Sequence, residues 1–422
     1  MLLNHPQLKW QWKAPPHILS MTVIDSYVEI DEILRSRDFR QGSHTESKPF
    51  FGDTLLLLDG DAHLGRRRLE SRLFRRDALD YYETHALVPV VEQMLAEARQ
   101  NRAADGTVRA DLVPMMRAML HRISAVVAGI DDVDIAERTE RFSSLVEKLG
   151  EAATVEWSTR DHADVVREGL DVKQAFLEEF WIASAERRKH LAKEFSAGTV
   201  AQEELPRDVL MMMYLNWDDT WDEELPIREC TLFLVASTQT TSHSLPHLFL
   251  HLHDWFEEHP EDSEKRTDSE FLRLAAAESL RLHQPVPSLL RFANTDVTLS
   301  SGRRIPRGER VALAFTPANR ETELFGDDAE LFNPYREASD RKRPWGLTFG
   351  GGVHLCIGRP LVTGTSTRTD SDAAAGTDGT MVKIARALYE SGLELDRDVL
   401  PKRNDTSFHD SYSSVPIVLT KL

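Results

Sequence analysis

The stretch FGGGVHLCIG, residues 349–358, holds one of only two cysteines in the chain. Three consecutive glycines and a histidine precede this residue, Cys356. Glycine tolerates positive φ and lets the backbone approach a ligand closely, so the run predicts a tight loop that presents the sulfur to something large and flat. Pro360 stands where a helix can begin, which would place Cys356 just before a helix N-terminus. Unpaired amides and the helix dipole there favour an anionic sulfur.

A single thiolate limits the kind of site that this loop can form. The other cysteine, Cys230, lies far upstream, so a zinc site of the usual four-ligand type is not expected. One thiolate can, however, be the single axial ligand of a haem iron. The alternative that needs no ligand is a glycine-rich surface turn with a buried cysteine.

The loop resembles the cysteine-ligand loop of the cytochrome P450 monooxygenases, a family with thiolate-ligated haem. The residues that match the family spacing F-x-x-G-x-H-x-C-x-G are Phe349, Gly352, His354, Cys356 and Gly358. The resemblance implies that these residues bind haem b, with the Cys356 thiolate as the axial ligand and Cys356 as the metal ligand. It covers nearly the whole chain from about Ile18, after a shortened N-terminus. It also implies a mainly α fold with small β-sheets, in which haem lies between a long central helix and the cysteine-ligand loop.

Composition bounds the class of protein. The chain has 422 residues, of which 41% are hydrophobic, and this is enough for a substantial core. Its net charge of −18 argues against a general affinity for nucleic acid, because a phosphate-binding surface should be basic. Two cysteines fit a reducing compartment, and neither a signal-peptide run nor 18 consecutive apolar residues occur. We therefore expect a soluble cytoplasmic protein with no membrane partner, and further expect a monomer with a single catalytic domain over residues 1–422.

Charged side chains that could hold the haem propionates occur in two segments. After a turn at residues 59–61, His63 and Arg67 lie four apart on one face of a predicted helix. A His-x-x-x-Arg pair at this point in the resembled family holds a propionate. Arg291 ends an extended segment, and an arginine there in the family binds a propionate as well. The resemblance therefore implies that His63, Arg67 and Arg291 bind the cofactor.

A helix through the centre of the protein is predicted by the apolar run at residues 231–236, which a polar segment follows. Thr240 is one turn past Ala236, so both can border the same cavity, and the resemblance places Ala236 at the haem. In the family an acid followed by threonine delivers protons; here Gln239 stands at the acid position and Ser237 replaces the usual glycine. An amide can organise water but cannot donate a proton as a carboxylic acid does.

Three routes remain open for proton delivery. It runs through Thr240 and water, or the substrate contributes a group, or the reaction differs from ordinary hydroxylation. A structural alternative is that the hydroxyls of this segment bond back to helix carbonyls.

Two further helical patterns follow. Glu278 and Arg281 lie three apart on one helix face, and with Arg336 they resemble the family's structural E-x-x-R set. Four histidines precede them, spaced over a helical segment that Pro246 would interrupt. We expect a surface run rather than a metal site from this set: His243, His247, His251 and His253.

Three surfaces remain to be assigned. The substrate cavity is expected to be partly hydrophobic, with candidate residues Phe233, Ala236, Val286 and Leu289. Six arginines crowd into eleven residues and form either a solvated helix face or a docking patch for an acidic electron donor: Arg66, Arg67, Arg68, Arg72, Arg75 and Arg76. An insertion at about residues 363–380, relative to the family, is either a tolerated surface loop or a feature near the face where donors dock.

The expected function follows from the resemblance. We expect a haem-dependent monooxygenase that inserts one oxygen atom from O2 into a small, partly hydrophobic organic substrate, with electrons from a separate ferredoxin or flavodoxin-type donor. Because Gln239 replaces the acid, a haem-thiolate enzyme of another outcome is the alternative, such as oxidative coupling, desaturation or peroxide-driven oxidation. A haem sensor without turnover is a third possibility. Thr240 and Gln239 are the expected catalytic residues.

Overall fold

The computed structural model describes residues 2–9, 12, 14–337, 343–365 and 376–422. Contacts divide the chain into two compact units, one formed by Met1–Ser43, Val91–Met115 and Thr240–Leu422, and the other by His44–Val90 and Met116–Gln239. We call them unit 1 and unit 2. The expectation of a single domain over residues 1–422 stays a prediction.

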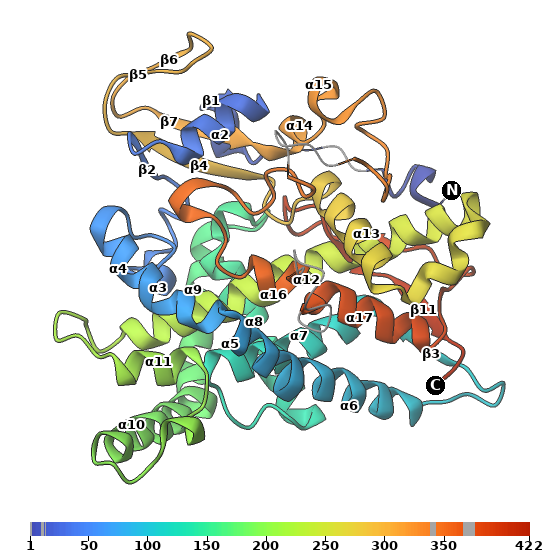
Figure 1. Ribbon diagram of the computed structural model, residues 1–422, viewed down its shortest axis with the longest axis horizontal. Coiled ribbons are helices and arrows are strands. Elements are labelled where there is room, and N and C mark those ends of the chain that lie inside the picture. The colour runs from blue at the N-terminus through green and yellow to red at the C-terminus, as the bar shows by residue number, and fades with distance from the viewer. Residues whose placement is uncertain (1, 10–11, 13, 338–342, 366–375) are drawn as a thin grey trace. The chain divides into compact units, whose positions relative to one another are not determined.

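Unit 1 holds the β-structure of the described residues. Its largest sheet has the order β1-β7-β4-β2, with β1 (Thr22–Ile24) parallel to β7 (Arg310–Ala314) and β4 (Ser288–Ala293) antiparallel to both β7 and β2 (Phe39–Gln41). Figure 1 shows α2 (Tyr27–Arg35) beside this sheet, where Ile30 and Ile33 pack with sheet residues in one apolar core. The smaller sheets join β3 (Val108–Asp111), β11 (Pro416–Leu419) and β8 (Leu393–Leu395); β5 (Val297–Thr298) and β6 (Arg304–Ile305); and β9 (Lys402–Arg403) and β10 (Tyr412–Ser414).

The remaining helices of unit 1 surround these sheets in sequence order. They are α1 (Pro16–Leu19), most of α6 (Val88–Arg99), α13 (Ser269–Leu282), α14 (Phe315–Ala318), α15 (Thr322–Phe325), α16 (Arg359–Thr363) and α17 (Gly379–Glu390). Much of the predicted insertion at 363–380 lies outside the described residues. At its two ends, the Thr365 amide donates to the Thr377 carbonyl at 2.9 Å, so the segment leaves and returns at one place.

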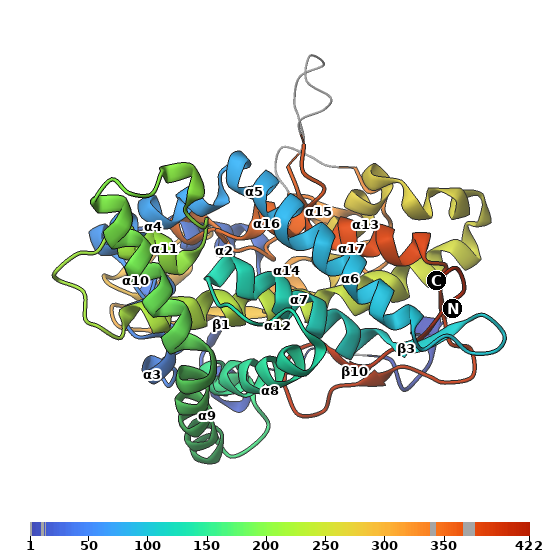
Figure 2. The ribbon, with the colours of Figure 1, turned by 90° about the horizontal axis from the view of Figure 1, so that it is seen from below.

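Unit 2 is helical. It contains α3 (Lys48–Phe51), α4 (Gly60–Glu70), α5 (Arg76–Tyr82), most of α7 (Leu112–Ala128), α8 (Ala136–Ala153), α9 (His162–Phe176), α10 (Ile182–Ser196) and α11 (Val209–Leu215). Helices α8 and α9 lie side by side (Figure 2). Gly169 permits this packing, because a Cβ there would lie 2.2 Å from the Ala152 Cβ.

The long central helix is α12 (Leu225–Glu258), and the division between the units falls within it, between Gln239 and Thr240. Its 34 residues span about 51 Å. Pro246, expected to interrupt a helix, lies inside it. Proline removes one helix hydrogen bond, but the fully buried neighbours Leu245 and Leu248 hold the segment in place.

The mainly α fold with small sheets is confirmed. Among the described residues, the structure contains no helix with both the length and the apolar character needed to cross a membrane.

Candidate active site

The cysteine loop takes its shape from two glycines. Gly350 and Gly352 have φ of +68° and +62°, a region that disfavours other residues. A Cβ on Gly352 would also lie 2.0 Å from the Leu34 carbonyl oxygen. The loop closes on itself, since the Cys356 amide donates to the Phe349 carbonyl at 2.9 Å and Arg343 Nη1 donates to the Gly350 carbonyl at 2.6 Å. The backbone around the cysteine is therefore held by both conformation and hydrogen bonds.

The sulfur of Cys356 is presented outward from this loop. Cys356 is exposed, whereas Cys230 is buried. The helix α16 begins at Arg359, close after the cysteine as the sequence predicts. Burial lowers the pKa of the Arg359 guanidinium, while the neighbouring Cys356 raises it, so the two groups interact electrostatically. Arg359 also lies over the Trp345 ring, with its guanidinium carbon 5.0 Å from the ring centroid.

These features fit a haem ligand. The Cβ position of Gly358 lies 3.9 Å from the sulfur, so the residue beside the thiol leaves space around it. A single exposed thiol next to a guanidinium is suited to one metal–sulfur bond with an anionic sulfur. Phe349, His354 and Gly358 are half-buried beside it.

Unit 1 also contains the other predicted cofactor and pocket residues of the later chain. Leu289 on β4 lies against the loop, with its Cδ1 3.8 Å from the Gly350 Cβ position, and Val286 is half-buried. Arg291 is 4% exposed, and its Nη1 donates to Gln41 Oε1 and to the Leu290 carbonyl, both at 2.8 Å. Hydrogen bonds from the protein therefore orient this guanidinium.

Unit 2 contains the predicted residues of the earlier chain. His63 on α4 is buried and Arg67 is half-buried. On α12, Phe233 is buried and stacks on Phe74 at 5.9 Å between ring centroids. Ala236 is exposed although the five residues before it are buried. This opening at Ala236 suits the close approach of a flat ligand.

The polar segment of α12 is partly occupied by local hydrogen bonds. Ser237 Oγ donates to the Phe233 carbonyl at 2.6 Å, and Thr238 Oγ1 donates to the Leu234 carbonyl at 2.7 Å. These bonds are the carbonyl back-bonding that the sequence offered as an alternative. Gln239 extends toward α8, where its amide nitrogen lies 2.1 Å from the Cβ position of Gly150.

The structural set Glu278, Arg281 and Arg336 comes together in unit 1. Arg281 Nη2 and Nε lie 2.7 Å from the two Glu278 oxygens, and Arg336 Nε lies 2.9 Å from Glu278 Oε1. Arg281 also donates to the carbonyls of Asn319 and Ala329, at 2.7 and 2.8 Å. The set thus joins α13 to the loops that follow α14 and α15.

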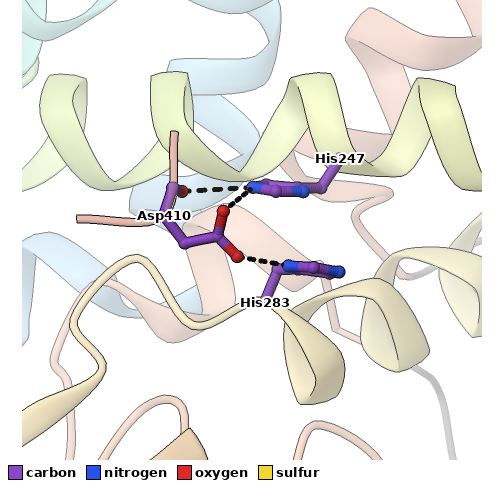
Figure 3. A group of neighbouring side chains, drawn as sticks. All are labelled: His247, His283 and Asp410. Carbon is purple, nitrogen blue, oxygen red and sulfur yellow. Dashed lines mark hydrogen bonds and ion pairs between the residues drawn. The ribbon is translucent and has the colours of Figure 1, made fainter. Parts of the chain in front are cut away.

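The expected surface run of histidines is wrong. His247 and His251 are 1% and 4% exposed, because α12 continues through Pro246 and turns them inward. His247 Nε2 donates to the Asp410 carbonyl at 3.1 Å, and His283 Nδ1 bonds to the Asp410 carboxylate (Figure 3). Burial opposes the ionisation of Asp410, but the two histidines outweigh it and hold the pKa of Asp410 well below its usual range.

The His247, His283 and Asp410 group has three potential metal-ligand atoms within 4.8 Å of one another. The two imidazole rings are stacked, 4.0 Å apart with an interplanar angle of 11°. The lone pairs that bind a metal lie in the ring planes, and nearly parallel planes do not meet at one ion. Both rings instead point their edges at the carboxylate (Figure 3). The group is therefore a hydrogen-bonded cluster.

One member of the arginine patch is misassigned. Arg66 is 8% exposed, and its Nη1 lies 2.7 Å from Glu229 Oε1 on α12. The spacing to Glu70, one turn further along α4, was the signal that this helix face is buried and polar. The exposed arginines are Arg68, Arg72, Arg75 and Arg76.

The fold and the loop together define a haem-thiolate protein of mainly α architecture. A model of the cytochrome P450 family matches residues 257–363. The chain is 26% identical over 389 residues to cytochrome P450 734A1 of Arabidopsis thaliana, covering 83% of this chain and 71% of that protein. It is 26% identical over 324 residues to cytochrome P450 109 of Bacillus spizizenii, covering 76% and 70%.

Solved structures agree in fold. The structure of CalO2 matches with a TM-score of 0.71 at 17% identity, covering 100% of this chain and 94% of the other. CYP109E1 from Bacillus megaterium in complex with testosterone matches with a TM-score of 0.67 at 17% identity, covering 99% and 97%. The chain belongs to the cytochrome P450 family. It is accordingly a haem-dependent monooxygenase whose cofactor is haem b with an axial cysteine thiolate.

Proposed function

We propose that this enzyme inserts one oxygen atom from O2 into a small, partly hydrophobic organic substrate, with Cys356 as the haem ligand. The observation that carries the proposal is the exposed Cys356 thiol, held by a glycine loop beside Arg359. Haem with a thiolate ligand supplies cleavage of the O–O bond. The chain supplies binding, orientation and protons.

The cofactor is held, in this proposal, by residues of both units. His63, Arg67 and Arg291 bind the propionates, since cationic and hydrogen-bonding side chains pair with carboxylates. Phe349, Gly352, His354 and Gly358 shape the loop around the sulfur. The small side chain of Ala236 leaves room for the ring. Glu278, Arg281 and Arg336 stabilise the protein around the loop.

The substrate is proposed to contact Phe233, Ala236, Val286 and Leu289, which are apolar. A screen of small molecules for a spin-state change in the haem spectrum would identify ligands. Because the CYP109E1 structure holds testosterone, steroids are a reasonable first set. An absence of any response from apolar ligands would contradict the assigned lining.

Electrons are proposed to come from a separate ferredoxin or flavodoxin-type donor that docks on the exposed arginines of α4 and the segment after it. Arg68, Arg72, Arg75 and Arg76 are exposed, and acidic donors are steered by such charges. The rate of electron transfer should then fall with rising ionic strength.

The substitution at residue 239 keeps a second outcome in view. A haem-thiolate enzyme that performs coupling, desaturation or peroxide-driven oxidation is supported by the amide of Gln239, which donates no acidic proton. Turnover with a surrogate ferredoxin and its reductase, compared with hydrogen peroxide alone, separates donor-driven from peroxide-driven reactions. Product analysis then separates oxygen insertion from coupling or desaturation.

The haem ligand is tested by Cys356→Ala. This variant should lose the carbonyl spectrum typical of thiolate-ligated haem, because the thiolate would be gone. Cys230→Ala is the matched control: Cys230 is buried with its thiol directed at the Ala128 carbonyl at 3.4 Å, and its replacement should keep that spectrum. Survival of the spectrum in Cys356→Ala would refute the assignment.

A further inference from the structure

A notch in α8 receives the side chain of Gln239. A Cβ placed on Gly150 would lie 2.1 Å from Gln239 Nε2, 2.8 Å from its Cδ and 3.5 Å from its Cγ. Separations below about 3 Å essentially do not occur for real Cβ atoms. The Gln239 carboxamide therefore occupies the space that any side chain at position 150 would need.

No local backbone requirement explains a glycine at this position. Gly150 lies inside α8, and its φ is outside the left-handed region. Glycine in a helix is less favourable than alanine. The close approach of Gln239 is the feature that accounts for it.

The opposite flank of the same helix segment is also held. Ser237 Oγ lies 2.7 Å from Ser124 Oγ on α7. At 100° per residue, Ala236 and Thr240 share one face of α12, while Ser237 and Gln239 flank that face on either side. Contacts with α7 and α8 thus orient both flanking side chains.

We propose that Gly150 is a positioning residue for Gln239. Its missing side chain seats the carboxamide on the α8 side of α12, and this seat sets where the amide can hold water beside Thr240. The proposal rests on the proposed function, in which Gln239 stands at the position of the family's acid. A displaced amide should uncouple reductant use from product formation.

The test compares Gly150→Ala, Gln239→Ala and the double variant in the haem-loaded protein. Gly150→Ala should fold, because only the end of a flexible side chain has to move. The first readout is thermal unfolding, which needs no turnover. In the Gln239→Ala background, Gly150→Ala should raise Tm by about 1 °C through its helix preference. In the wild-type background the displaced amide should cancel or reverse this rise.

Gly65→Ala on α4 is a control for helix preference, because no atom lies within 4 Å of its Cβ position. Its effect on Tm should not depend on residue 239.

The second readout is product formed per reductant consumed. Gly150→Ala should lower this ratio about twofold or more, as expected for residues in contact, and should change nothing once Gln239 is alanine. Additive effects in either readout would overturn the proposal. Because the unfolding cycle is independent of the Cys356→Ala spectrum, failure of the seat and failure of the proposed function remain distinguishable.

Discussion

Glu70 and Glu229 are two fully buried carboxyl groups that meet in unit 2. Both are 0% exposed. Glu229 accepts from Arg66 Nη1 at 2.7 Å and from the Leu55 amide at 3.1 and 3.2 Å. Burial, and then the charge of Glu229, raise the pKa of Glu70 well above its usual range. Glu70 is therefore protonated at neutral pH and donates to the ionised Glu229.

The two carboxyl groups should respond differently to the same substitution. Glu70→Gln keeps a neutral donor and should leave the free energy of unfolding at pH 7 within about 0.5 kcal/mol or above that of the parent. Glu229→Gln leaves the buried Arg66 without its anion and should cost about 3–5 kcal/mol. Denaturant unfolding of both variants measures the contrast, and equal losses would contradict it.

The pH dependence of Glu70 follows from the direction of its shift. A raised pKa in the folded state gives stability that is complete below the unfolded pKa and is lost as pH rises toward the folded pKa. Glu70→Gln removes this loss, so the variant should gain on the parent as pH rises above 7.

Residue-scale prediction from sequence worked where spacing encodes the chemistry. The cysteine loop and the pairing of Glu278 with Arg281 depend on short separations, so their patterns are visible in the chain. Arg66 was placed in an exposed patch because its partner Glu229 is 163 positions away. Distant partners of this kind are set by packing and leave no local pattern.

At the scale of elements, Asp410 joins four segments of unit 1. It lies between β9 and β10, bonds to His247 on α12 and to His283 after α13, and forms an ion pair with Arg403 on β9. Burial lowers the pKa of His283 to about 3, so this ring is neutral and donates to the carboxylate. The cluster therefore fastens the C-terminal strands to two helices.

Replacing the carboxylate should loosen this fastening. Asp410→Asn cannot accept from both histidines and also balance Arg403, so it should lower the free energy of unfolding by about 3 kcal/mol. Asp398→Asn, at an exposed position near the same strands, is the control and should stay within about 0.5 kcal/mol. Denaturant unfolding measures both, and a silent Asp410→Asn would show that the cluster adds no stability.

The sequence predicted the long central helix but not this cluster. Hydrophobic periodicity encodes the helix, and Pro246 suggested an end that the surrounding apolar packing overrides. Asp410 is 127 positions from His283, in a segment without a regular pattern. Only the folded chain brings the two together.

For the whole molecule, buried neutral histidines set the response to acid. Burial lowers the pKa of His121 in unit 2 to about 3, as it does that of His283 in unit 1. Unfolded histidine takes up a proton near pH 6.5. Between pH 6.5 and 3 the unfolded state thus binds more protons than the folded state, and stability falls as pH falls.

The slope of this loss is measurable. Each such histidine should remove about 1.4 kcal/mol of unfolding free energy per pH unit below 6.5. His121→Gln should therefore flatten the curve between pH 6 and 4 by about that slope. His190→Gln, at a position whose side chain is 71% exposed, should leave the slope unchanged. A curve for His121→Gln that parallels the parent would contradict the assignment.

The unequal surroundings of the two thiols have a practical consequence. Cys230 is inside the helix packing, where burial raises its pKa well above the usual value, whereas Cys356 is open to reagents. Iodoacetamide should alkylate one sulfur in each folded chain, and a sulfur bound to iron should be spared. Mass spectrometry after alkylation would therefore count, chain by chain, the fraction of a preparation that carries its cofactor.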